Sequence, residues 1–426
     1  MHRDQPRSPA RRRRPRGALA VTAAAVLATA AGALAGPAAA APDRPVPAPA
    51  ADTAQSAALP VDASTPAAEL DTGAGGAVRP FACGDGSFHA QAVREGNTWR
   101  APGYSGPDML TAMRAAVGSL DPGRTTAQRV VVRGSGTVPA NQSLDLPSHT
   151  SLDVCGTLQV SGAVAANHAP IRVRNATDVT VGHLAMTGHP YFGVFVRNAT
   201  GVTLGALDLR LSGGLGVRID NHGDRSVRTR NVRIDHVLVS GTDNHGVETY
   251  GVDGLTVGTV IARDTGYSGL LLNDTTNATV GRVDAVGAGT GTGYAAFRMA
   301  NRNGRVGNAY PVNIRVGEVV ARGGGRGVFC VSESGGVEIG RVDIAGTGSN
   351  AILIENCYNV NLATAGGTVS GPGDVRIASR AEFAVTRDVT LQNLTIRDTA
   401  LRESPCGVGI AYRNLTLHNS ARSTCS

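Results

Sequence analysis

The sequence predicts an all-β protein built as a solenoid of stacked parallel coils, and three observations predict it. A five-residue phrase at 178–182, DVTVG, returns as GVTLG at 201, GLTVG at 254, NATVG at 277 and GVEIG at 336. Most steps between its copies are 23 residues, and the longer steps of 29, 30 and 36 residues add insertions to that period. Apolar residues alternate between the copies, and Gly, Asn and Asp separate the runs, which favours short strands over helices.

A period of 23 residues is long enough for one coil of three short strands. One side chain of each alternating pair then points into a shared core. We therefore predict a right-handed parallel β-helix with about 23 residues per rung. A leucine-rich repeat would need a fixed leucine and asparagine pattern that is absent, and a β-propeller would need about 40 or more residues per blade.

The first 40 residues are expected to form a secretory signal peptide. Residues 1–16 hold seven arginines, and an uncharged, alanine-rich run extends from Gly17 to Ala41. A basic start, an apolar run and small residues near the cleavage point are typical of export. An uncleaved membrane anchor is the alternative. We expect cleavage, and hence a secreted, extracellular chain without a membrane contact.

Two further segments follow the predicted signal peptide. Residues 41–79 are rich in Pro and Ala without an apolar period, as in a linker. Residues 80–426 are expected to form the β-helix domain. Its one convincing helix lies within residues 105–120, where Asp108 is a plausible N-cap before Met109 and Leu110.

Composition argues against a nucleic-acid partner. Residues 1–40 hold seven Arg and one Asp, so the formal charge of +7 falls to about +1 in the remaining chain. All 40 basic residues are arginine, which excludes any mechanism that needs a lysine. Six cysteines in an exported chain suggest three disulfides, although six allow fifteen pairings. Their spacing suggests the pairs Cys83–Cys155, Cys330–Cys357 and Cys406–Cys425.

Three stretches carry a family resemblance. They are DMLTAMRAAV at 108–117, RVVVRGSGTVPANQSLDLPSHTSLDVCGTLQV at 129–160, and the VTVG-type rungs that follow. Together they resemble the pectin lyase-like β-helix superfamily over roughly residues 80–420. The resemblance implies a short N-terminal helix that caps the open end of the core. It leaves the reaction open, because the superfamily includes polysaccharide lyases, polygalacturonases, epimerases and phage tailspikes.

A second alignment predicts where a site lies. Short strands recur as GVRIDN at 216, GVETYG at 246, GLLLND at 269 and AFRMAN at 296. Their second and fourth residues should face the core, and their third and fifth residues should face solvent. Polar residues should therefore meet on one face across three or four rungs, namely Asp220, Asp243, His245, Glu248, Tyr250, Asn273 and Arg298.

The turns and insertions around these strands predict a substrate groove. Tyr191, Tyr267 and Tyr294 occupy equivalent turn positions, where they form a ladder for sugar rings or pack between loops. Insertions at 222–230 and 302–311 follow the same strand and would wall the groove. Arg218, Asn301 and Arg302 are further expected contacts to a polysaccharide or oligosaccharide.

Three functions compete for these residues, and we expect a monomer in each case. A hydrolase would use Asp220 and Glu248, which we place about 8 Å apart, within the inverting range. Asp243 is a spare carboxylate for this pair, and His245 or Arg298 would hold the substrate or tune an acid. We prefer this hydrolase reading because it needs the fewest assumptions.

The other two readings need a different use of the same face. A pectate lyase-like enzyme would use Arg298 as base and Tyr250 or Tyr267 as acid. Calcium, the one cofactor considered, would then be held by Asp220, Asp243 and Glu248. The polygalacturonase motif set is missing, since TDNHG at 242–246 is only a partial echo of it. A non-catalytic glycan-binding or surface β-helix is the third possibility.

Overall fold

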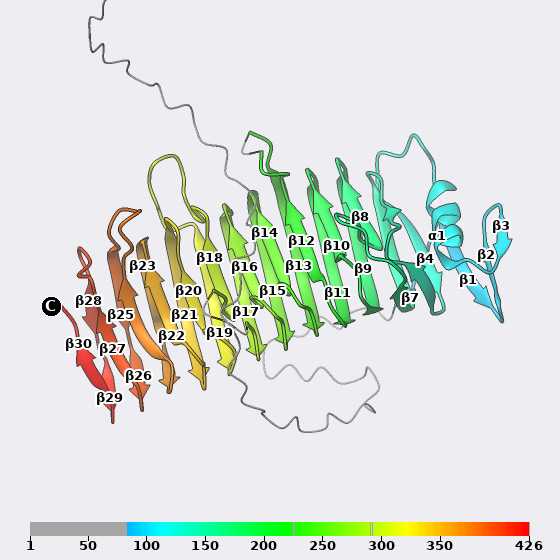
Figure 1. Cartoon of the computed structure of the whole chain (residues 1–426). Coiled ribbons are helices and arrows are strands. Elements are labelled where there is room, and N and C mark those ends of the chain that lie inside the picture. The colour runs from blue at the N-terminus through cyan, green and yellow to red at the C-terminus, as the bar shows by residue number, and fades with distance from the viewer. Residues whose placement is uncertain (1–82, 225, 290, 292, 426) are drawn as a thin grey trace, which may run out of the picture. The chain divides into compact units, whose positions relative to one another are not determined.

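The computed structural model describes residues 83–425 except 225, 290 and 292. The predicted signal peptide and linker, residues 1–40 and 41–79, lie outside the described residues. The described residues form a parallel β-solenoid of about 13 turns, with successive coils about 23 residues apart (Figure 1). The prediction of a right-handed parallel β-helix is therefore confirmed. In the described part of the chain, no helix is long and apolar enough to cross a membrane.

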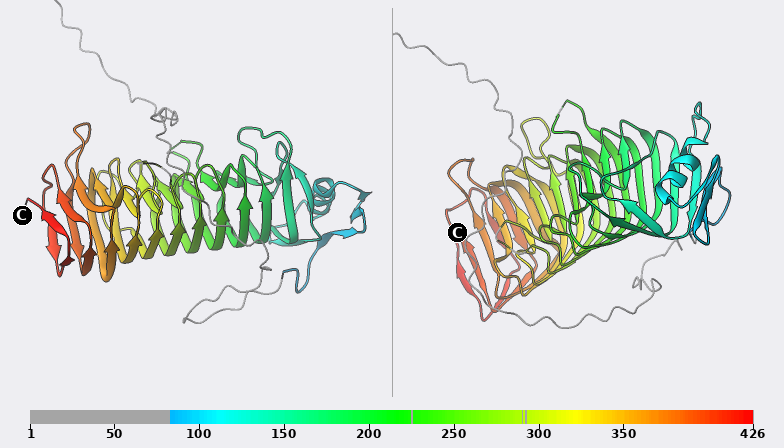
Figure 2. Two further views of the ribbon diagram at one scale, coloured as in Figure 1. Left: turned by 60° about the horizontal axis from the view of Figure 1, so that its bottom comes forward. Right: turned by 45° about the vertical axis from the view of Figure 1, so that its right-hand side comes forward.

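A small cap covers the N-terminal end of the stack (Figure 2). It consists of the strands β1 (Ala90–Glu95), β2 (Thr98–Ala101) and β3 (Tyr104–Gly106), and the helix α1 (Met109–Gly118). Asp108 is the N-cap of α1, and its carboxylate accepts a hydrogen bond from the Thr111 N–H at 2.5 Å. Met109 and Met113 are buried against the core of the first coils. The predicted capping helix is thus confirmed.

One sheet holds the long strands, which are mostly 12 residues in the central coils. Beyond the cap its members are β4 (Gln128–Arg133), β5 (Gly136–Pro139), β7 (Thr150–Ser161), β9 (Thr177–Gly188), β11 (Thr200–Leu211), β13 (Thr229–Ser240), β15 (Val252–Arg263), β17 (Thr276–Val286), β19 (Ile314–Arg322), β21 (Ser334–Ala345), β23 (Cys357–Ser370), β25 (Arg387–Gln392), β26 (Leu394–Arg397), β28 (Ala411–Arg413) and β29 (Thr416–His418). These strands pair in parallel with the coils on either side.

A second, 12-stranded sheet holds the short strands. Its members are β6 (Leu144–Asp145), β8 (Ile171–Arg174), β10 (Phe192–Arg197), β12 (Leu215–Asp220), β14 (Val247–Tyr250), β16 (Leu270–Asn273), β18 (Phe297–Ala300), β20 (Val328–Cys330), β22 (Asn350–Glu355), β24 (Asp374–Ala378), β27 (Ala400–Glu403) and β30 (Ala421–Ser423). Neighbours in this sheet pair in register, so that Arg218 lies beside Glu248 and Asp220 beside Tyr250. This sheet carries the residues predicted for the site.

A ladder of glycines occupies the middle of the long strands. A Cβ added at Gly281 would lie 2.5 Å from the carbonyl oxygen of Gly258, one coil earlier, and Gly317 and Gly340 repeat this contact. The backbones therefore approach closely at these glycines, and Asp235 is the residue with a side chain at the equivalent position between Gly205 and Gly258. This contact explains the final glycine of the VTVG phrase, by which the repeat was found.

Three disulfides join the cysteines as the spacing suggested, in the pairs Cys83–Cys155, Cys330–Cys357 and Cys406–Cys425. The first ties the start of the described chain to β7. The second crosses the core between β20 and the start of β23, where both cysteines are fully buried. The third closes the last coil.

Candidate functional site

The outward positions of the short strands alternate with core residues, as predicted. Val217 and Ile219 are buried in the main core, and Arg218 and Asp220 point to the other side of the sheet. The expectation that these outward residues face solvent is wrong for many of them. Phe195, Leu271 and Phe329, for example, are buried in two small clusters outside the main core. Long arginine side chains and the turns cover this face. A side chain that points away from the core can therefore still be shielded from solvent.

Charged groups on β10, β12 and β14 form one continuous network. The Arg197 guanidinium donates to both oxygens of Asp220, at 2.5 and 2.7 Å. Arg218 donates from Nε to Asp220 at 3.0 Å, and its Nη1 contacts Glu248. Arg218 therefore bridges Asp220 and Glu248, the two carboxylates predicted as a catalytic pair.

The protonation state of Asp220 follows from this network. Only 1% of its surface is exposed. Burial alone would raise the pKa of Asp220, but the hydrogen bonds and charges of Arg197 and Arg218 outweigh burial and hold that pKa below its ordinary value. The two carboxylates likewise outweigh burial at Arg218 and raise the pKa of its guanidinium. Asp220 is therefore an anion at neutral pH.

The network continues through amides on the next two coils. Asn273 on β16 donates to Glu248 at 3.0 Å, and Asn301 after β18 donates to Asn273 at 2.9 Å. The predicted residues Arg218, Asp220, Glu248, Asn273 and Asn301 are thus brought together. We call these five residues and Arg197 the polar relay.

An aromatic group lies at the other end of the same strands, in the turns that precede them. The rings of Tyr267 and Tyr294 stack with centroids 3.9 Å apart and planes 13° apart. His245 packs edge-on against both rings, at 5.3 and 5.8 Å between centroids. Two of the three tyrosines predicted to form a ladder do stack, and His245 closes one end of the pair.

His245 is held as a neutral imidazole. Its Nδ1 accepts a hydrogen bond from the Ser268 N–H at 3.0 Å, so the proton of the neutral ring lies on Nε2. Burial, followed by the positive charges of Arg298 and Arg218, holds the pKa of His245 well below its ordinary value. In this state His245 offers a hydrogen-bond donor and no positive charge.

Arginines stack on aromatic rings at two places along the face. Arg298 lies 5.8 Å from the Tyr294 ring centre and 5.5 Å from the Phe329 ring centre. Arg326 covers Phe329 as well, at 4.5 Å. Five coils earlier, Arg174 and Arg197 lie 5.0 and 4.6 Å from the ring centre of Phe195. Each phenylalanine is thus in cation–π contact with two arginines.

Three predicted residues lie apart from both groups, and a fourth, Tyr250, flanks the polar relay without a hydrogen bond to it among the described residues. Asp243 is exposed, accepts from the Gly214 N–H at 2.9 Å and lies 3.9 Å from His189. Tyr191 packs against Phe192 at 4.6 Å, away from the other two tyrosines. Arg302 pairs with Glu333 at 3.1 Å. Tyr250 ends β14 beside Asp220 and Asn273 and is half-buried.

The carboxylates considered as calcium ligands are not gathered into one cluster. Asp220 and Glu248 are each tied to Arg218, and Asp243 lies in a turn beside His189. Among the described residues, no group of three or more His, Cys, Asp or Glu side chains could hold a metal ion. The donor set therefore does not fit calcium, and no step below uses the ion.

The two insertions leave the same edge of the short-strand sheet, where Figure 1 shows them as loops after β12 and β18. In the first, Arg228 reaches two coils along to donate to the Asp274 carbonyl at 2.8 Å. In the second, the Tyr310 hydroxyl donates to the Glu333 carbonyl oxygen. Both loops are therefore fixed to neighbouring coils beside the polar relay.

Sequence reasoning missed two arginines of this face. Arg197 occupies an outward position of β10, and its register opposite Asp220 could have identified it as the main partner of that carboxylate. Arg326 lies in a turn, outside the alternating positions, and no periodic signal pointed to it.

No family model and no curated protein sequence matches this chain. Several solved structures do match. The A-module of the mannuronan C-5 epimerase AlgE4 of Azotobacter vinelandii is 14% identical, with 74% of this chain and 95% of that chain covered and a TM-score of 0.39.

Two other matches are not described as epimerases. Tailspike protein 2 of Escherichia coli O157:H7 bacteriophage CAB120 is 11% identical, with 72% of this chain and 40% of that chain covered and a TM-score of 0.35. The surface adhesin PfbA of Streptococcus pneumoniae is 12% identical, with 73% of this chain and 87% of that chain covered and a TM-score of 0.32. Fold similarity at this level leaves function to be argued from the site.

Proposed function

We propose that this protein is an exported, monomeric β-helix that binds an acidic polysaccharide along its short-strand sheet and cleaves it by β-elimination. One observation carries the proposal: arginines outnumber carboxylates at the outward positions of this sheet. The arginines are Arg172, Arg174, Arg197, Arg218, Arg298, Arg376 and Arg402, and the carboxylates are Asp145, Asp220, Glu248, Glu355 and Asp374. The three disulfides support export, because such bonds persist in oxidising compartments.

The ligand class follows from the kinds of groups on this face. Guanidinium groups bind carboxylates and sulfates through charge-assisted hydrogen bonds. The Tyr267–Tyr294 pair offers an aromatic surface of the kind on which sugar rings stack. A glycan rich in uronic acid satisfies both requirements in one molecule.

Elimination is favoured over the hydrolysis that the sequence suggested. A hydrolase needs one protonated carboxyl group as acid, and Asp220 is a buried anion held by two arginines. Glu248 is tied to Arg218 and Asn273. We therefore propose that both carboxylates position Arg218 and do not exchange protons with substrate.

In the proposed elimination, a base removes the proton from the carbon beside the uronate carboxyl group. The bond from the next carbon to the glycosidic oxygen breaks, a carbon–carbon double bond forms, and the leaving oxygen takes up a proton. Arg298 is better suited to neutralise the uronate carboxylate than to act as the base, because a guanidinium keeps its proton. We assign the proton transfers to the hydroxyl groups of Tyr267 and Tyr294, and hydrogen-bond donation to His245.

A non-catalytic glycan-binding protein is the second candidate. It is favoured by the polar relay, in which the carboxylates are engaged with arginine or amide groups. Such a network fits a rigid binding face as well as it fits an enzyme.

One experiment separates these functions. The purified secreted chain is incubated with polygalacturonate, alginate and a neutral glucan, and we measure binding, new reducing ends and the ultraviolet absorbance of unsaturated uronates. We expect reducing ends together with absorbance on an acidic glycan, and loss of both in Tyr267→Phe. The matched control is Arg315→Met, because Arg315 is exposed on the opposite sheet.

Three other outcomes contradict the proposed elimination. Reducing ends without absorbance would restore the hydrolase reading. Binding to acidic glycans without cleavage would favour the non-catalytic protein. No preference for acidic over neutral glycans would overturn the proposed ligand class.

A further inference from the structure

We propose a dedicated subsite for the acidic group of a sugar, built around Arg326, one coil beyond Tyr294, and the hollow that begins on the next coil. The inference rests on the proposed function, since it names the residue that binds the negatively charged group of the glycan. The group recognised is an oxyanion on a sugar ring, and we assign it as the carboxylate of a uronic acid.

Arg326 is a buried cation without a matching anion in direct contact. Only 7% of its surface is exposed. Its Nε donates to the Asn350 side-chain oxygen at 2.8 Å, and its face covers Phe329, but neither group carries a negative charge. Its Nη1 has no hydrogen-bond acceptor among the described residues. Burial of a cation with so few acceptors is costly unless a ligand supplies the missing charge.

The electrostatics agree with this geometry. Burial lowers the pKa of Arg326 to about 10, and the positive charge of Arg298 acts in the same direction. Glu355 and Asp374 oppose this shift as more distant charges, since neither makes a direct ion pair with Arg326. The environment therefore favours the arrival of an anion.

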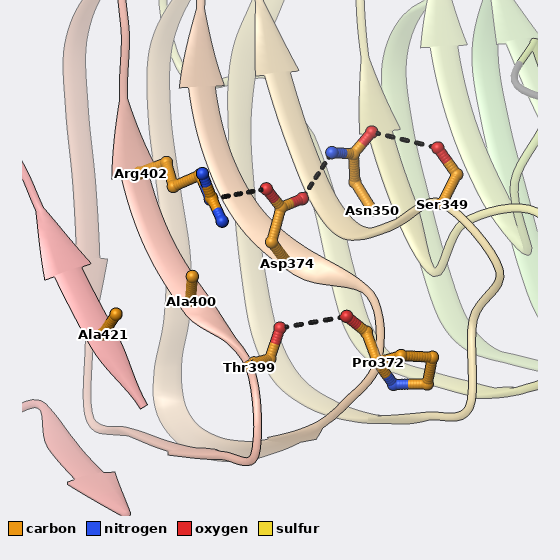
Figure 3. A pocket seen from close by; sticks show the side chains of 8 residues that line it. All are labelled: Ser349, Asn350, Pro372, Asp374, Thr399, Ala400, Arg402 and Ala421. Carbon is orange, nitrogen blue, oxygen red and sulfur yellow. Dashed lines mark hydrogen bonds and ion pairs between the residues drawn. The ribbon is translucent and has the colours of Figure 1, made fainter. Parts of the chain in front are cut away.

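A hollow of about 460 Å³ is lined by Asn350, the hydrogen-bond partner of Arg326, and Figure 3 shows the side chains that line it. Asn350 forms the shared wall, because it accepts from Arg326 and donates to Asp374 at 2.5 Å. Arg402 lies across the hollow, with its Nε 3.4 Å from Asp374. The volume is within the range of about 300–1,000 Å³ that small-molecule sites occupy. Arg402 therefore lines a hollow of a size that suits a sugar residue, and Arg326 lies behind its Asn350 wall.

The hollow lies in line with the tyrosine pair. Ser349, which lines it, occupies the same turn position before β22 as Tyr267 and Tyr294 occupy before their strands. Between Tyr294 and Ser349 this position is Gly325, which carries no side chain. Two coils separate Tyr294 from Ser349, which is about 10 Å at 4.8 Å per coil. A glycan stacked on the tyrosines would therefore reach Arg326 and the hollow within a few sugar residues.

The test uses paired ligands and a charge-removing variant. Uronate oligosaccharides from polygalacturonate and alginate are compared with their carboxyl-reduced, neutral forms by calorimetry on the full secreted chain. We expect Arg326→Met to weaken binding of the acidic forms at least tenfold and to leave the neutral forms unchanged. Asp374→Asn should tighten acidic binding several-fold, because it removes a negative charge from the hollow. Arg315→Met should behave as the wild type.

Thermal unfolding separates a binding role from a structural one. If Arg326 serves to bind a ligand, Arg326→Met removes a buried charge that has few acceptors. The melting temperature of the variant should then equal or exceed that of the wild type, and its affinity for acidic oligosaccharides should be lost. A lower melting temperature with unchanged acidic binding would make Arg326 a structural residue and overturn the inference.

The remaining outcomes identify which proposal fails. Equal binding of acidic glycans by the wild type and by Arg326→Met would overturn this subsite alone. A wild type that binds no acidic glycan overturns the proposed function and the subsite together. Arg326-dependent binding of a sulfated glucan oligosaccharide, without binding of uronates, would overturn the assignment to carboxylates.

Discussion

Arg218 Nε lies 3.0 Å from Asp220 Oδ2, and the same guanidinium contacts Glu248 one coil further on. The contact turns two acidic residues of adjacent strands into one neutralised group, with Arg197 as a second cation on Asp220. Asp220 therefore has a structural role, because its carboxylate orients the guanidinium groups of Arg197 and Arg218.

Asp220→Asn should destabilise the fold by about 1–3 kcal/mol, because it removes the buried carboxylate that accepts from Arg197 and Arg218, although Arg218 keeps Glu248. Urea unfolding of the two proteins measures this difference. Glu95→Gln is the matched control, since Glu95 pairs with Arg100 at 2.5 Å with both side chains more than half exposed. Such a pair contributes about 0–1 kcal/mol. Equal effects of the two substitutions would contradict the structural role of Asp220.

His245 should make the fold sensitive to mild acid. The pKa of His245 is well below 6.5 in the folded state, so the unfolded chain binds more protons once the pH falls below 6.5. The stability that neutral His245 contributes is complete above about pH 6.5 and is lost as the pH falls toward the folded-state pKa. Urea unfolding between about pH 5 and 8 should show this slope.

His245→Asn tests the assignment, because its side-chain oxygen can replace Nδ1 as the acceptor of the Ser268 N–H. The variant should lose most of the slope between pH 5 and 6.5. His418→Asn, at an exposed position on β29, should keep it. An unchanged slope in His245→Asn would show that other groups titrate in this window.

The fold was predictable because its causes recur in the sequence. The close backbone approach at Gly258 and Gly281 favours glycine at this position of most coils, so the architecture is visible as a period. Register was predictable for the same reason, and it placed Arg218 beside Glu248. A fixed period specifies which residues are neighbours across coils.

Burial on the outward face was not predictable from alternation. Alternation specifies only which side of the sheet a side chain leaves. Whether Asp220 or Leu271 is then covered depends on how long side chains and turns from neighbouring coils fold over it. The Arg326 contact with Asn350 joins the turn before β20 to the first residue of β22, and no spacing rule anticipates it.

Tyr267→Ala should weaken binding of an acidic oligosaccharide about tenfold, or about 1.4 kcal/mol, because it removes half of the stacked pair. Tyr267→Phe should keep the affinity and lose cleavage, since the ring stays and the hydroxyl is removed. Tyr191→Ala is the control, because Tyr191 packs on Phe192 and lies outside the pair. Calorimetry and product formation distinguish the variants, and an equal loss of affinity in Tyr191→Ala would argue for a longer ladder.

Gly281→Ala should destabilise the solenoid by about 1–3 kcal/mol, because overpacking forces the backbone to shift. The added Cβ would lie 2.5 Å from the Gly258 carbonyl oxygen, which belongs to the backbone of the adjacent coil. Gly118→Ala, at the end of α1, is the matched control, since nothing lies within 4 Å of its added Cβ. That control should be unchanged or up to about 1 kcal/mol more stable. Similar urea midpoints for the two variants would show that the glycine ladder is not required for close stacking of the coils.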